Sequence, residues 1–268
     1  MSSSHTYVIC WDGALENCKD IESQLAASDV DYTFFNVSSY DYDSPNWIRA
    51  EDIRYYGHFY NALNHFLQTD KKVLIFNAGD VPYHDYVGYT KKIEALFASD
   101  PAVAIFAPSF DNDGFSGSGS FIQESTLHNN LYLATHTNGI IVAMSREIVQ
   151  LMYDFYLWGR GTGRIDFDSM KSGWGLDTVY NSFAIYLNKK IYRDNLIMHH
   201  PASSSYDHLT ATKEMNHITD ESKHFSNSIG MDPGIIHSIQ RIITRKAMSR
   251  QPITVKQVYL NMKEKFEV

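Results

Sequence analysis

Short apolar runs alternate with amphipathic stretches along the first 200 or so residues of the chain. Unbroken apolar runs that end at turn residues are typical of buried strands, and apolar residues spaced three and four apart are typical of helices. The pattern predicts strands over residues 6–10, 31–37, 73–76, 103–107, 137–144 and 190–197. It predicts helices over residues 15–28, 51–68, 86–99, 145–158 and 177–187.

Alternating strands and helices are typical of an α/β fold with a doubly wound, mostly parallel sheet. Residues 38–47 and the glycine- and serine-rich segment 111–121 are predicted loops. After about residue 207 the chain becomes polar and less patterned. Residues 235–248 are predicted to form an amphipathic basic helix, which is a docking tail, a membrane-surface helix or an ordinary packed helix. Membrane contact through this helix is not predicted.

Composition narrows the classes of function. The formal net charge is -8 at pH 7, which disfavours a nucleic-acid-binding surface and means that an anionic substrate needs a local cation. Cys10 and Cys18 form no CxxC pair, which fits a reducing compartment. We find neither a secretion-signal pattern nor an apolar run near the roughly 18 residues that span a bilayer. We therefore expect a soluble, cytoplasmic protein.

Several well-known motifs are absent from the sequence. No GxGxxG follows the first strand, and no GxxxxGK[ST], GxSxG or HExxH occurs. The first three absences weigh against a nicotinamide-binding Rossmann domain, a P-loop protein and an α/β-hydrolase.

The segment VLIFNAGDVPYHD places Asn77 and Asp80 directly after an apolar strand. Ligands of doubly wound sheets bind beyond the carboxyl ends of the strands. A carboxylate at such a place is either an ordinary turn residue or a ligand for Mg²⁺ or Mn²⁺, which prefer oxygen ligands and share substrate phosphates.

Two later segments also carry candidate chemistry. In SGWGLDTVY, glycines flank Trp174 and allow a close approach to a ligand, and Asp177 opens a helix. That carboxylate is either an N-cap or a general base. In LIMHHPASSSYD, His199 and His200 end an apolar strand, and each is either structural or a metal ligand.

Together, these three segments resemble the layout of a GT-A glycosyltransferase, from about residue 7 to residue 206. The resemblance implies a Rossmann-like, mostly parallel central sheet flanked by helices. It implies a catalytic domain of residues 1–206, with a nucleotide-sugar-binding half (1–100) and an acceptor half (101–206). Residues 207–268 would form a C-terminal extension that is partly helical.

The resemblance also implies roles at the metal and at the reacting centre. VLIFNAGDVPYHD matches the apolar strand and the final Asp of the family's DxD-type metal motif. It departs from that motif where Asn77 stands in place of the first Asp and the spacing is one residue longer. Asp80 is thus the implied ligand of Mn²⁺ or Mg²⁺, completed by His199 or His200. Asp177 is the implied base of an inverting transfer.

Other implied contacts are to the donor. Asn36 and Ser38, at the end of the second strand, correspond to the place where the family meets the base or ribose. Asn61, within GHFYNALNHFL, corresponds to an amide near the donor. Asn77 and Trp174 complete the implied donor site.

The implied function is the transfer of a sugar from a nucleotide-sugar donor to a hydroxyl of a glycan or another acceptor. Two alternatives stay open. One is a sugar-phosphate nucleotidyltransferase, although the segment CWDGALENC lacks the glycine-rich basic signature expected after the first strand. The other is a non-catalytic, degenerate transferase that binds nucleotide-sugar, which Asn77 in place of Asp keeps open.

Overall fold

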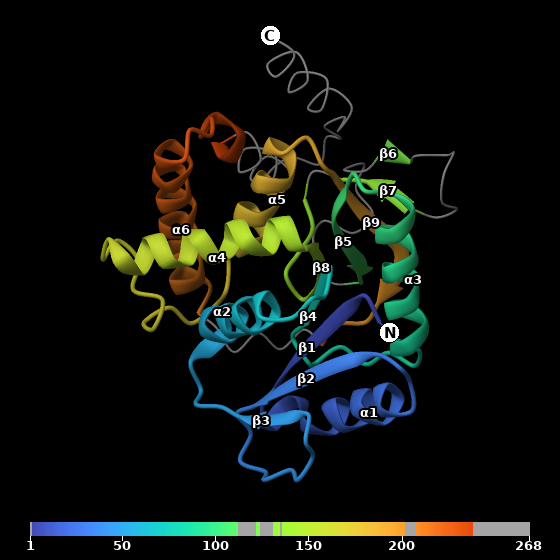
Figure 1. Ribbon diagram of the computed structural model, residues 1–268. Helices are drawn as coiled ribbons and strands as arrows, with labels where there is room; N and C mark the ends of the chain where they lie inside the picture. The colour runs from blue at the N-terminus through green and yellow to red at the C-terminus, as the bar shows by residue number, and fades with distance from the viewer. Residues whose placement is uncertain (1, 112–121, 124–130, 135, 202–206, 238–268) are drawn as a thin grey trace.

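A computed structural model of the chain describes residues 2–111, 122–123, 131–134, 136–201 and 207–237 (Figure 1). Most of the predicted loop 111–121 and of the predicted helix 235–248 lies outside these residues. The strands are β1 (Ser4–Cys10), β2 (Asp31–Asn36), β3 (Trp47–Arg49), β4 (Val73–Asn77), β5 (Val103–Phe110), β6 (Ile122–Gln123), β7 (Leu131–Leu133), β8 (Ile141–Ser145) and β9 (Lys190–Met198). The helices are η1 (Asp12–Ala14, a 3-10 turn), α1 (Leu15–Ala26), α2 (Arg54–Leu67), α3 (Tyr86–Ser99), α4 (Arg146–Gly161), α5 (Leu176–Tyr186) and α6 (His208–Ser228).

The strands form one sheet in the order β3-β2-β1-β4-β8-β5-β9-β7-β6. β1, β2, β3 and β4 are parallel to one another, and β5 is parallel to β9. β8 runs antiparallel to both of its neighbours, β4 and β5, so the sheet is mostly parallel, as predicted, with a reversed strand near its centre. An apolar run such as IIVAM shows that a strand is buried but does not show its direction.

Helices cover both faces of this sheet (Figure 1). α1 and α3 pack on one face, in a cluster that includes Cys18, Ile21 and Ile93. α2, α4 and α5 pack on the other face, in a cluster that includes Phe59 and Phe183. The predicted fold class is therefore confirmed as an α/β fold with a mostly parallel mixed sheet flanked by helices.

Some elements differ from the prediction. The helix predicted over residues 86–99 has the same bounds as α3. By contrast, the strand predicted over residues 137–144 begins only at Ile141. β3 begins inside the predicted loop 38–47, and α6 is a long helix in the segment predicted to be weakly patterned. α6 packs against α4 and α5 and contributes Ile218 and Phe225 to the core.

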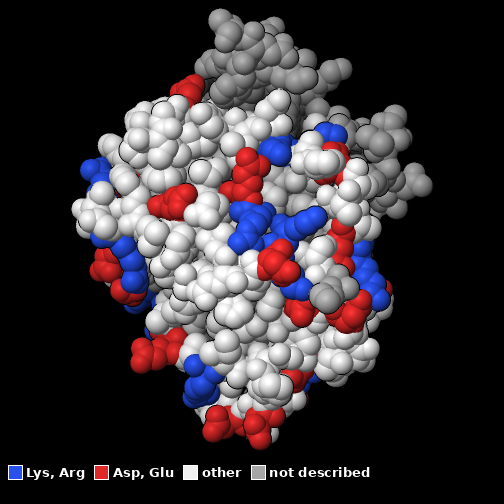
Figure 2. All heavy atoms as spheres, viewed as in Figure 1, with Lys and Arg blue, Asp and Glu red and all other residues white. Residues whose placement is uncertain are grey.

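Charges on the surface alternate in sign over short distances. On the face in Figure 2, lysine and arginine side chains form a central group with acidic side chains beside it. Ion pairs between elements include Lys71–Asp31, Lys189–Glu147 and Lys190–Asp100. Among the described residues, no helix is both long and apolar enough to cross a membrane.

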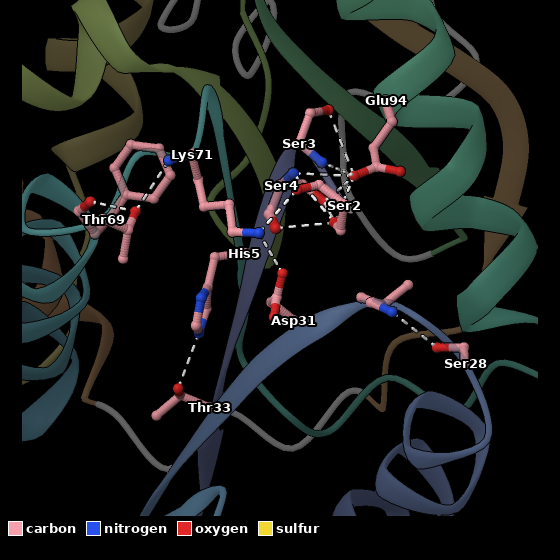
Figure 3. A network of polar contacts seen from close by, with 12 residues as sticks. Ser2, Ser3, Ser4, His5, Ser28, Asp31, Thr33, Thr69, Lys71 and Glu94 are labelled. Carbon is pink, nitrogen blue, oxygen red and sulfur yellow. Dashed lines mark hydrogen bonds and ion pairs between the residues drawn. The ribbon is translucent and has the colours of Figure 1, made fainter.

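A polar network holds the start of β1 (Figure 3). Glu94 of α3 accepts hydrogen bonds from the backbone N–H groups of Ser3 (2.7 Å) and Ser4 (2.9 Å) and from the Ser2 hydroxyl (2.6 Å). Burial of Glu94 opposes its ionisation, but these hydrogen bonds outweigh burial and hold its pKa below the usual value. The network fixes the amino end of β1 against α3, at the opposite end of β1 from the candidate site.

Candidate functional site

The turn after β4 carries Asp80. The side chain of Asn77 accepts a hydrogen bond from the backbone N–H of Gly79 at 2.8 Å, which closes the turn on itself. From α1, the Asn17 amide donates to the carbonyls of Gly79 (2.8 Å) and Val81 (2.9 Å). Asn77 thus stabilises the loop that presents Asp80, a role that an amide fills as well as a carboxylate does.

Gly79 is required in this turn for two reasons. Its φ is +87°, in the left-handed region that glycine adopts without strain. A Cβ atom at this position would lie 1.9 Å from the carbonyl oxygen of Ile9 in β1. The close approach holds the Asp80 turn against the end of β1.

Asp80 meets His200, which is 120 positions later in the chain. Asp80 Oδ2 lies 3.2 Å from His200 Nε2, and the two side chains are 19% and 21% exposed. Asp80 Oδ1 is buried and has no hydrogen-bond partner among the described residues. The pair therefore places a carboxylate oxygen that has no partner among the described residues next to an imidazole.

His199 has a different partner. Its Nδ1 lies 2.6 Å from Asp111 Oδ2, and the backbone N–H of His200 donates to Asp111 Oδ1 at 3.2 Å. The ring of His200 lies edge-on to Phe110, with 6.0 Å between ring centroids. Asp111, which the sequence analysis did not single out, thus holds the histidine pair so that His200 reaches Asp80.

The donor set of this pair fits a divalent ion in part. Within the described residues, no group of three or more His, Cys, Asp or Glu side chains is arranged to hold a metal. Mg²⁺ and Mn²⁺ are commonly held by one or two protein carboxylates, with substrate phosphates and water as further ligands. Asp80 and His200 match that pattern, in which the protein supplies two ligands and the substrate supplies others.

Asp177 lies in the first turn of α5. The helix is capped by Gly175, at φ +98°, so Asp177 is not the N-cap residue. Its Oδ1 accepts a hydrogen bond from the backbone N–H of Thr178 at 2.8 Å, and its Oδ2 lies 3.4 Å from His136 Nε2. Burial raises the pKa of Asp177 to about 6, and the backbone N–H groups at the helix start oppose that shift. A carboxylate with a raised pKa is suited to accept a proton near neutral pH.

Trp174 stands just before this helix and is half-buried. Its carbonyl accepts a hydrogen bond from the Tyr56 hydroxyl, and its N–H donates to Ser172 Oγ at 3.2 Å. A Cβ on Gly173 would lie 2.2 Å from the ring of Tyr55, so only glycine allows this loop to pack on α2. Two successive tyrosines of α2 therefore set the position of the Trp174 loop.

One segment, residues 136–141, touches both parts of the site. At one end, the N–H of Ala78 donates to the Ile140 carbonyl at 2.8 Å, next to the Asp80 turn. In the middle, the Tyr55 hydroxyl donates to the Gly139 carbonyl. At the other end lies His136, beside Asp177. The segment thus links the Asp80 turn to the Asp177 helix at the carboxyl end of β4.

The predicted donor residues lie in different surroundings. Asn36 ends β2, and its side-chain oxygen accepts hydrogen bonds from the N–H (3.0 Å) and hydroxyl (2.7 Å) of Ser38. Both side chains are buried in this turn, so a nucleotide would meet them only through the turn that they shape. Asn61 is half-buried in the middle of α2. At a rise of 1.5 Å per residue, it lies ~10 Å along the helix from Arg54, the first residue of α2.

Sequence reasoning missed two neighbours of the predicted residues, His136 and Asp111. His136 lies directly before residues 137–144, which were predicted to form a strand. The signal available was Asn138-Gly139, a turn dipeptide that separates His136 from the apolar run.

Comparison with known proteins yields distant structural similarity only. No family model matches the sequence, and no curated protein is similar to it. A putative nucleotide-diphospho-sugar transferase from Desulfovibrio desulfuricans G20 is 10% identical, with a TM-score of 0.40, and the match covers 82% of this chain and 99% of that one. A second structure, 4-diphosphocytidyl-2C-methyl-D-erythritol synthase from Anaerococcus prevotii DSM 20548, is 10% identical, with a TM-score of 0.40, and the match covers 80% of this chain and 95% of that one. A third, a glycosyltransferase involved in the glycosylation of the major capsid of PBCV-1, is 8% identical, with a TM-score of 0.33, and the match covers 80% of this chain and 98% of that one.

Proposed function

We propose that this protein is an inverting glycosyltransferase that moves a sugar from a nucleotide-sugar to an acceptor hydroxyl. The observation that supports this most directly is the contact of Asp80 with His200, at 3.2 Å, at the carboxyl end of β4. A carboxylate with one buried oxygen free, next to an imidazole, suits a divalent ion shared with a diphosphate. Asp177, on the other side of segment 136–141, supplies a base.

In the proposed reaction, Asp80 and His200 would hold Mn²⁺ or Mg²⁺, which supplies positive charge to the leaving diphosphate. Asp177 accepts the proton of the acceptor hydroxyl. The acceptor oxygen forms a bond to the anomeric carbon while the bond from that carbon to the diphosphate breaks. A single displacement from the opposite face inverts the anomeric centre. Trp174, held beside α5, would line the donor site.

The decisive experiment compares the wild type with Asp177→Asn, using a panel of nucleotide-sugars with and without Mn²⁺. Donors are first chosen by thermal stabilisation, since a ligand that binds only the folded state raises Tm. The variant is expected to bind the donor as the wild type does and to lose transfer, because an amide does not accept the proton. NMR of the product is expected to show an inverted anomeric centre.

Other outcomes would contradict the proposal. Unchanged turnover in Asp177→Asn would remove Asp177 as the base, and retained anomeric configuration would exclude the single displacement. Release of diphosphate from CTP or UTP with a sugar phosphate, and no transfer from any nucleotide-sugar, would identify a nucleotidyltransferase instead. Donor binding with no turnover under any condition would identify a degenerate binding protein.

A further inference from the structure

A buried histidine lies beside the proposed base. His136 is 8% exposed, and its Nε2 lies 3.4 Å from Asp177 Oδ2. The two residues come from different elements, His136 from the segment before β8 and Asp177 from the first turn of α5. A buried imidazole costs free energy unless its nitrogens have partners, and Asp177 is one such partner of His136.

Asn181 lies beside the other ring nitrogen of His136, Nδ1. Its amide nitrogen donates to the carbonyls of Asp177 (2.7 Å) and Thr137 (3.2 Å), and its amide oxygen lies 3.3 Å from the Thr137 hydroxyl. These partners orient the amide so that its nitrogen, which can only donate, lies 3.5 Å from His136 Nδ1. Nδ1 therefore faces a nitrogen that cannot accept a proton, which favours the neutral ring form with its proton on Nε2, the nitrogen that lies 3.4 Å from Asp177 Oδ2.

We propose that His136 is a positioning residue that holds the Asp177 carboxylate through a neutral Nε2–H donor. This inference rests on the proposed function, in which Asp177 is the base. In this arrangement, Oδ1 accepts a hydrogen bond from the Thr178 N–H at 2.8 Å, and the proposed Nε2–H of His136 is directed at Oδ2 across 3.4 Å. A carboxylate has about four lone-pair positions, so room remains for the acceptor proton. That proton passes from the acceptor oxygen to Asp177, and His136 neither gains nor loses one.

The arrangement makes His136 a determinant of the basicity of Asp177. A donor to the ionised form lowers the pKa of a carboxyl, so the Nε2–H opposes the effect of burial. The other titratable groups near the pair are Tyr55 and Tyr56 of α2, Tyr180 of α5 and Glu214 of α6, with Arg193 of β9 near Tyr180. Burial raises the pKa of Tyr56 and of Tyr180, so both stay neutral through the acidic range. The acidic limb of the rate profile is therefore assigned to Asp177.

The kinetic test compares His136→Phe with His136→Gln. Phenylalanine fills the space without a donor, and the Gln amide restores one. In His136→Phe, the acidic limb of kcat/KM is expected to move up by about one pH unit and kcat to fall about 10- to 100-fold, with donor binding unchanged. His136→Gln is expected to return the limb toward the wild-type position. An unchanged profile in His136→Phe, or equal profiles in the two variants, would overturn the proposal.

A second measurement does not depend on activity. In wild-type protein, ¹⁵N NMR is expected to show the proton of His136 on Nε2, and Asp177→Asn is expected to shift that proton resonance upfield as its acceptor weakens. A proton on Nδ1, or a resonance unchanged by Asp177→Asn, would overturn the proposal. If the NMR result holds and no sugar transfer is found, the pairing stands and the proposed function fails.

Discussion

His199 and His200 are neighbours in sequence with different partners in space. His200 reaches Asp80, whereas His199 is 65% exposed and binds Asp111. The sequence predicted both as metal ligands because adjacent histidines cannot be told apart by pattern. A strand directs successive side chains to opposite sides, and the two histidines follow directly on β9, which ends at Met198, so their side chains are directed differently.

This difference provides a test within one dipeptide. Mutation of a residue that only hydrogen-bonds to a metal ligand typically lowers metal affinity or activity roughly 10- to 100-fold. Loss of a ligand itself should cost more, so we expect His200→Ala to reduce Mn²⁺-dependent transfer by more than about 100-fold. The matched control, His199→Ala, removes a more exposed imidazole and is expected to keep transfer within about 10-fold. Turnover measured over a Mn²⁺ titration checks both, and equal losses in the two variants would argue against His200 as the ligand.

Gly79 is the residue on which the Asp80 turn depends. In Gly79→Ala, the new Cβ would strain the backbone at φ +87° and clash with the Ile9 carbonyl. We expect a loss of about 2–4 kcal/mol in the free energy of unfolding, measured by urea denaturation. Gly161→Ala is the matched control, because a Cβ at Gly161 meets nothing within 4 Å, and a change within about 0.5 kcal/mol is expected. A similar free energy for both variants would show that the turn tolerates a side chain.

At the scale of elements, α6 supports the loop that leads to Asp177. Glu214 accepts hydrogen bonds from the N–H groups of Lys171 (2.9 Å) and Ser172 (2.8 Å) and from the Ser172 hydroxyl (2.6 Å). A Cβ on Gly175 would also lie 3.1 Å from the Met215 backbone. The base helix α5 is thus positioned by a helix in the segment predicted to be an extension.

Glu214→Ala tests this support. Loss of the three hydrogen bonds is expected to loosen residues 171–175 and to lower kcat about 10-fold or more through misplacement of Asp177, with donor affinity unchanged. Glu221→Ala, on the same helix, removes only the pairing with Arg164 on the surface and is expected to leave kcat as in the wild type. Steady-state kinetics and donor titration separate the two, and equal kcat in both variants would contradict the assigned role of Glu214.

Several elements were predictable because their local pattern agrees with the fold. Helix α3 and strands β1, β2, β4 and β9 were found within a few residues of their bounds. Residues 207–268 were predicted to be partly helical, but the position of α6 was not predicted, because Thr219, Ser222 and Ser226 are buried on the same helix as Ile218 and Phe225 and hide the apolar period. β3, β6 and β7 are short strands whose pairing partners lie far away in the sequence.

The candidate site was predictable to the extent that each part sits at the end of one element. Asp80 and His200 lie in the turns that follow strands β4 and β9, and carboxyl ends of parallel strands gather at one edge of a sheet. The partners of these residues were not predictable, because Asp111 and His136 are fixed by contacts across the fold. A single sequence carries no signal for such contacts beyond the turn residues beside them.

At the scale of the whole molecule, the described residues pack as one body around the sheet. Phe225 of α6 is 3% exposed and contacts the rings of Phe155, Trp158 and Phe183 from α4 and α5. The same helices lie over the central strands, on the face that also carries α2. The predicted division at residue 206 therefore separates α6 from helices that share its core cluster.

This packing predicts how the protein unfolds. Phe225→Ala should lower the free energy of unfolding by about 3–5 kcal/mol, since it leaves a cavity among aromatic rings. Leu209→Ala, on the same helix but 73% exposed, should change it by no more than about 0.5 kcal/mol. Because α6 and the sheet share one core, tryptophan fluorescence and far-UV circular dichroism should report the same single transition in both variants. Two separate transitions in Phe225→Ala, with the β-sheet signal of circular dichroism lost only at the second, would contradict this. They would show that residues 1–206 fold independently and that α6 is a separable extension.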